Sequence, residues 1–139
     1  MKNYHSAIRI LVIDAQSYWR QLCAHALREA GFFVKDCADY QTAQLLKEEA
    51  DFIILSCTKI NSSEQELISQ FLQEKRHLLV FSSHLPSSTV RSLYSQGIDD
   101  VADKTYAPPI LVELVQQLLA KITPFGENTH LVKGRISLW

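Results

Sequence analysis

The sequence predicts an α/β fold, a five-stranded parallel sheet with helices on both faces. Two observations carry this prediction: five short apolar runs alternate with five stretches of helical spacing, and several of the runs are almost continuously apolar, as in strands buried on both faces. The connections are long enough to hold crossover helices. At 139 residues the chain is the size of one ordinary domain.

The first half begins with a β-branched run over residues 8–14 that ends on Asp14. A helix follows from Ser17, a candidate N-cap, and Gly31 ends it because glycine is favoured just past a helix C-terminus. Residues 32–38 form a second strand that is less apolar than the first, which suggests a place nearer the sheet edge. A helix over residues 41–50 comes next.

The third strand is the apolar run Phe52 to Leu55, and it ends abruptly on Ser56 and Cys57. Ser62 and Ser63 with Glu66 give a capping-box pattern that opens the next helix. Residues 77–82 form the fourth strand, which also ends on a hydroxyl.

The last part has a fourth helix after Pro86, with a thin apolar stripe, closed by Gly97. Residues 100–102 can form only a short fifth strand. Pro108 and Pro109 then open a strongly amphipathic helix that extends to residue 122.

Composition places the chain among folded, soluble proteins, with 47% hydrophobic and 21% charged residues and a net charge of −1. This balance gives no general reason to expect nucleic acid or membrane as a partner, and no apolar run has the length of a membrane span. The N-terminus lacks the apolar core of a signal peptide, so we expect a cytoplasmic protein. The three cysteines show no metal-ligand spacing, and Cys57 is the only candidate for a redox role.

Polar residues gather where the strands end: Asp14 after the first, Ser56 after the third, Ser82 after the fourth and Lys104 after the fifth. The carboxyl ends of parallel strands meet at one edge of a sheet, which is where open α/β sheets place their sites. We therefore expect these four side chains to form one site.

At this edge the chain resembles the receiver domain of two-component response regulators, over residues 6–122. The resemblance is carried by Ile10-Leu-Val-Ile-Asp14, by Gly97-Ile-Asp-Asp-Val-Ala-Asp-Lys104, and by the spacing of Ser82 from Lys104. It implies the flavodoxin-like (βα)5 architecture with strand order 2-1-3-4-5. It also implies that Ser82 is the switch hydroxyl and that Val101 stands at the aromatic switch position.

The resemblance makes this an atypical pseudo-receiver, because Ser56 stands where the family has its phospho-accepting aspartate. Ala15 replaces the second member of the acidic pair, and in the family both replaced acids are direct metal ligands. Mg²⁺ prefers carboxylate oxygens, so we expect no metal or other cofactor at this degenerate phosphorylation site. Ser56 also lacks a neighbouring base in the sequence pattern, so we expect no enzymatic activity. Asp14 and Lys104 are then free to pair with each other.

The function expected from the resemblance is phosphorylation-independent signalling through contact with a protein partner or a second copy. The family commonly uses its fourth helix, fifth strand and fifth helix for such contacts, which here span residues 88–115. Two alternatives stay open: a regulatory domain of a transcriptional regulator whose DNA-binding effector is absent from this chain, and a sensory domain with a small ligand in the altered site. Residues 123–139 are expected to be a C-terminal tail or linker.

Overall fold

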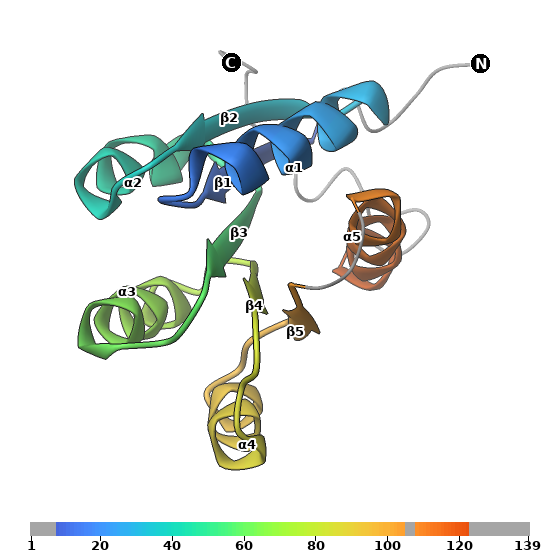
Figure 1. Ribbon diagram of the computed structural model, residues 1–139. Coiled ribbons are helices and arrows are strands. Elements are labelled where there is room, and N and C mark those ends of the chain that lie inside the picture. Colours follow the sequence, from blue (N-terminus) through green and yellow to red (C-terminus); the bar gives the residue numbers. More distant parts are fainter. Residues whose placement is uncertain (1–7, 105–107, 123–139) are drawn as a thin grey trace.

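The computed structural model describes residues 8–104 and 108–122 and confirms the predicted α/β architecture (Figure 1). Five parallel strands form one sheet in the order β2-β1-β3-β4-β5. The strands are β1 (Arg9–Ile13), β2 (Phe33–Cys37), β3 (Phe52–Cys57), β4 (Leu78–Ser82) and β5 (Asp100–Asp103). The helices are α1 (Ser17–Glu29), α2 (Tyr40–Leu46), η2 (Lys47–Glu49), α3 (Ser62–Gln73), α4 (Ser87–Ser95) and α5 (Pro108–Ile122). The proposed tail, residues 123–139, lies outside the described residues.

Two hydrophobic cores lie on the two faces of the sheet, as the alternation of side chains along each strand requires. Ile10 and Val12 of β1 face α1 and α5, where they join Leu27 and Leu111. The alternate residues of the sheet pack against α2, α3 and α4. β1, β3 and β4 are buried along their whole length, which explains their continuous apolar sequence.

Two predicted helix N-caps were wrong, although α1 begins at Ser17 as expected. Gln16, not Ser17, is the N-cap of α1, because the Asp14 carboxylate already accepts the Gln16 N–H and turns the chain one residue earlier. The capping box of α3 lies two residues before the predicted one: the Asn61 N–H donates to Glu64 Oε1 at 2.9 Å. Asparagine caps a helix as well as serine does, so either register satisfied the sequence pattern.

The predicted helix over residues 41–50 is also shorter than expected. It begins at Tyr40, with Asp39 as a side-chain cap accepting from the Thr42 N–H, and it tightens to a 3₁₀ turn at η2. Gly31 and Gly97 follow α1 and α4 with positive φ values of 103° and 97°, as their role in ending these helices requires. Within the described ranges no helix has the length and apolarity needed to span a bilayer.

Candidate functional site

The carboxyl edge of the sheet brings the four predicted polar residues into one region. β3 and β4 are aligned so that Cys57 lies opposite Ser82, and β4 and β5 so that Ser82 lies opposite Asp103, one residue before Lys104. Asp14 follows β1 directly. Asp14, Ser56 and Ser82 are each 2% exposed and Lys104 is 4% exposed. Burial of so many polar groups is costly unless each has a partner, so their contacts define what this edge can do.

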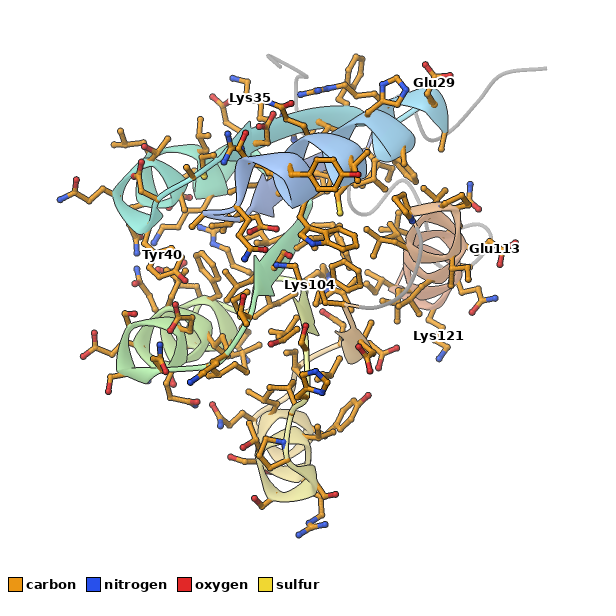
Figure 2. All side chains as sticks on the ribbon, in the orientation of Figure 1. Glu29, Lys35, Tyr40, Lys104, Glu113 and Lys121 are labelled. Atoms are coloured by element: carbon orange, nitrogen blue, oxygen red, sulfur yellow. The ribbon has the colours of Figure 1, made fainter. Side chains whose placement is uncertain are left out.

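Lys104 and Asp14 form a buried ion pair, with Nζ 3.4 Å from Oδ2. The ammonium also donates a hydrogen bond to Gln16 Oε1 at 3.0 Å and lies 5.9 Å from the centre of the Trp19 ring. Figure 2 shows Lys104 directed into the interior, in contrast to Lys35 and Lys121. The pair expected from the sequence is therefore present, but it is part of a larger set of contacts.

Gln16 connects the strand ends at this edge by hydrogen bonds, a role that no sequence pattern predicted. Its N–H donates to Asp14 Oδ1 at 2.9 Å, its Oε1 accepts from Lys104, and its Nε2 donates to Thr58 Oγ1 at 3.4 Å. One glutamine thus contacts groups from the ends of β1, β3 and β5. A glutamine in a loop carries no pattern, so only the fold could reveal this role.

Ser82 and Val101 lie apart from the cavity described next. The Ser82 hydroxyl donates to the Thr58 carbonyl oxygen at 3.3 Å, and the Ser82 carbonyl accepts the Lys104 N–H at 3.0 Å. Both contacts hold neighbouring strand ends together. Val101 is half-buried and packs against the core that includes Leu93 and Ile98.

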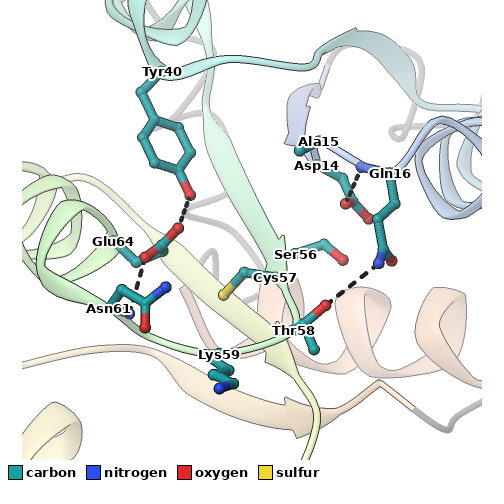
Figure 3. Close-up of a pocket in the computed structure, with 10 residues that line it drawn as sticks. All are labelled: Asp14, Ala15, Gln16, Tyr40, Ser56, Cys57, Thr58, Lys59, Asn61 and Glu64. Atoms are coloured by element: carbon teal, nitrogen blue, oxygen red, sulfur yellow. Dashed lines mark hydrogen bonds between the residues drawn. The ribbon is translucent and has the colours of Figure 1, made fainter.

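A cavity of about 380 Å³ opens between the ends of β1 and β3 (Figure 3). Asp14, Ala15 and Ser56 line it, together with Cys57, the redox candidate, and six residues that the sequence did not single out for a site: Gln16, Tyr40, Thr58, Lys59, Asn61 and Glu64. Ser56 Oγ is fully buried and has no hydrogen-bond partner among the described residues. Its hydroxyl therefore has hydrogen-bonding capacity that no described residue uses.

The wall opposite Asp14 consists of Tyr40 and Glu64, whose side chains are joined by a hydrogen bond of 2.6 Å from the Tyr40 hydroxyl to Glu64 Oε2. Burial by itself would raise the pKa of Glu64, but hydrogen bonds donated by Tyr40, the Asn61 N–H and the Ser63 hydroxyl outweigh it and lower the pKa. Glu64 is therefore an ionised acceptor at neutral pH.

Cys57 also lines the cavity, but burial raises the pKa of its thiol to about 11. A thiol that stays protonated at neutral pH is a poor nucleophile, which disfavours the redox alternative. Within residues 8–104 and 108–122, no three histidine, cysteine, aspartate or glutamate side chains group as metal ligands would.

No protein-family model and no curated protein sequence matches the chain, whereas many solved structures share its fold. An orphan response regulator of H. pylori superimposes with a TM-score of 0.73 at 19% identity, covering 82% of this chain and 98% of that one. The chemotaxis response regulator CheY4 of Vibrio cholerae gives a TM-score of 0.68 at 20% identity, with coverage of 80% and 98%.

A third similar structure is an atypical orphan response regulator described as having a phosphorylation-independent regulatory mechanism. It gives a TM-score of 0.68 at 20% identity and covers 80% of this chain and 94% of that one. At these identities the likeness establishes the fold, which is that of response-regulator receiver domains. It does not assign the site.

Proposed function

We propose that this receiver fold serves as a cytoplasmic signalling domain that works without phosphoryl transfer, by binding a protein partner or a second copy of itself. The observation that carries the proposal is the state of Asp14, the one acid that this chain keeps of the three that the family has at its phosphorylation site. Asp14 is held by Lys104 and Gln16, and Ala15 and Ser56 supply no second or third carboxylate. Transfer of a phosphoryl group in a receiver needs a carboxylate nucleophile and a metal bound by acids, so both requirements are unmet.

The contacts of Lys104 support the same conclusion. In a phosphorylated receiver, as the resemblance implies, this lysine would stabilise the phosphoryl group. Here its ammonium already faces Asp14, Gln16 and the Trp19 ring. A buried ion pair that forms without metal or phosphoryl group favours one conformation, so we propose that output depends on abundance or partner binding.

The test is intact-mass spectrometry after incubation with acetyl phosphate and Mg²⁺. We expect no gain of a phosphoryl group. The double substitution Ala15→Asp with Ser56→Asp restores the missing carboxylates on the same fold and serves as the positive control. Phosphorylation of the unsubstituted chain would overturn the proposal.

For the contact surface we propose the face formed by α4, β5 and α5. Tyr94 on α4 is 47% exposed and Ile110 on α5 is 48% exposed, which places a large apolar side chain on each of the two helices. The Tyr94 hydroxyl donates a hydrogen bond to Asp100 Oδ1, which fixes the ring beside β5. Apolar and aromatic side chains of this kind provide most of the binding energy at protein interfaces.

Light scattering coupled to size exclusion tests the self-association form of this proposal. Tyr94→Asp and Ile110→Asp should each shift a dimer toward monomer, whereas Leu45→Asp should not. Leu45 is a fitting control because it is 80% exposed on α2, outside the proposed surface. If the chain is monomeric at all concentrations, self-association is excluded. Binding of a different protein is then tested with the same three variants.

A further inference from the structure

The cavity at the carboxyl edge has a floor with unused hydrogen-bonding capacity. Ser56 Oγ has no hydrogen-bond partner in the described part of the chain, and Asp14 Oδ2 accepts no hydrogen bond although it is ion-paired with Lys104. Figure 3 shows the Ser56 hydroxyl on the same side of the β3 end as the Asp14 carboxylate. A hydroxyl and a carboxylate oxygen together can accept N–H groups from a bound molecule.

The opposite wall adds a negative charge that its hydrogen-bond partners do not neutralise. Glu64 accepts hydrogen bonds from Tyr40, Asn61 and Ser63, and all three donors are neutral. Lys59 lines the same cavity but is exposed, and Figure 3 shows it across the Thr58–Asn61 loop from Ser56. The space between Ser56 and Glu64 therefore favours positive charge.

An anion does not fit this arrangement. Among the described residues, Lys104 carries the one buried ammonium at this edge. It does not line the cavity, and it faces Asp14 and Gln16. A phosphate or carboxylate in the cavity would be repelled by Glu64, and the ion pair of Lys104 with Asp14 leaves that ammonium unavailable to offset the repulsion. The charge of the lining thus selects against the anions that a phosphate-binding edge would accept.

We propose that this cavity binds a small organic cation with N–H donors, of the alkylammonium or alkylguanidinium class. Its N–H groups donate to Ser56 Oγ and Asp14 Oδ2, and its charge lies beside Glu64. The volume of about 380 Å³ accommodates a molecule of this size. In this arrangement the serine that replaces a phospho-acceptor becomes a ligand-binding residue, and occupancy of the cavity would report the presence of the cation.

The experiment is a ¹H–¹⁵N NMR titration of the full chain with methylguanidinium chloride and, separately, methylammonium chloride, at constant ionic strength. We expect saturable shifts that centre on the backbone amides of residues 14–16 and 56–64. Ser56→Ala should weaken binding by about tenfold, the usual effect of losing a hydrogen bond to a charged group. Glu64→Gln should weaken it to a similar extent while keeping the hydrogen bond with Tyr40.

Thr89→Ala is the matched control, because Thr89 lines only the adjacent cavity of about 390 Å³ between the β3–α3 and β4–α4 loops, which shares Thr58, Lys59 and Asn61 with the proposed one. It should leave the affinity unchanged, and the spectrum of each variant shows whether it is folded. Equal binding of neutral methylurea, preferential binding of acetate, shifts outside the cavity, or no saturation with either cation would each overturn the proposal. None of these outcomes bears on phosphoryl transfer, so this test is independent of the mass-spectrometry test above.

Discussion

Lys104 Nζ donates a hydrogen bond of 3.0 Å to Gln16 Oε1, joining residues that are 88 positions apart in the sequence. The same glutamine reaches Thr58 after β3 and the Asp14 carboxylate after β1. A neutral side chain thus links the ends of β1, β3 and β5.

The Gln16 link predicts a measurable loss of stability when the side chain is removed. Gln16→Ala should lower the free energy of unfolding by about 1 kcal/mol, because two side-chain hydrogen bonds are lost at a partly exposed position. Urea denaturation measures this change. Gln21→Ala is the control, since Gln21 is exposed on the same helix and alanine favours a helix slightly. Equal effects of the two substitutions would show that the link contributes nothing.

The Asp14–Lys104 pair predicts strong coupling between its members. Lys104→Met should cost about 3 kcal/mol, because it leaves a carboxylate buried without its cation. Adding Asp14→Asn should recover part of that loss, and a double-mutant cycle should give a coupling energy above about 1 kcal/mol.

The pair Arg28–Asp36 provides the comparison for that cycle. Its ion pair is 3.1 Å long, but half of the Arg28 side chain is exposed. Exposed pairs are screened by water and salt, so its coupling should stay below about 1 kcal/mol. Additive effects of the Asp14 and Lys104 substitutions would contradict the proposed role of the buried pair.

Glu74 predicts a pH-dependent contribution to stability. Partial burial opposes ionisation, but hydrogen bonds from Lys47, Arg76 and Gln70 outweigh it and lower the pKa of Glu74 to about 2. A carboxyl group whose pKa is lower in the folded state stabilises the fold above its ordinary pKa of 4.5, and this stabilisation is lost as the pH falls toward about 2. Because Glu74 is exposed to solvent, salt should weaken the effect.

Thermal unfolding measured between pH 6 and pH 3 tests this contribution. Glu74→Gln should lower the melting temperature at pH 6, and the difference from the unsubstituted chain should shrink as the pH approaches 3. Glu74 is the C-cap of α3, and Glu66 is an exposed residue of the same helix. Glu66→Gln should leave the melting temperature unchanged at each pH. A difference that is constant across the range would rule out the ion-pair explanation.

We expect the three cysteine thiols to react slowly with alkylating reagents in the folded protein. Burial raises the pKa of Cys23, Cys37 and Cys57 to about 11 each. Because the thiolate is the reactive form, iodoacetamide at pH 7.5 should label the native chain slowly and the urea-unfolded chain quickly. Rapid labelling of Cys57 in the native state would revive the redox alternative.

Magnesium should have no specific effect on the stability of the unsubstituted chain. A ligand that binds only the folded state raises the melting temperature by an amount that grows with the logarithm of its concentration over its dissociation constant. Asp14 is already paired with Lys104, so this edge offers Mg²⁺ little affinity. The variant with Ala15→Asp and Ser56→Asp should be stabilised by millimolar Mg²⁺. Potassium chloride at the same ionic strength is the control. Stabilisation of the unsubstituted chain would show that the edge holds metal with other ligands.

The sequence by itself determined the sheet, its edges and the position of the site. The spacing and burial of the apolar residues decide this. β1, β3 and β4 carry continuous apolar runs because both faces of a central parallel strand are covered, and the polar residues that follow these runs lie together at one edge. An ion pair between Asp14 and Lys104 could therefore be predicted from the sequence. Helix starts were less certain because Gln16, Ser17, Asn61 and Ser63 compete within one or two residues, and the hydrogen bonds that choose among them depend on tertiary context.

Only the tertiary structure decided what surrounds Ser56. Tyr40 and Glu64 begin two different helices, and nothing in their spacing relates them until the sheet order places α2 beside α3. Gln16 contacts Lys104 because β1 and β5 both end at the same edge. The physical reason is that local sequence sets the period and the burial of each element, whereas hydrogen bonds between loops depend on distances that exist only after the sheet has formed.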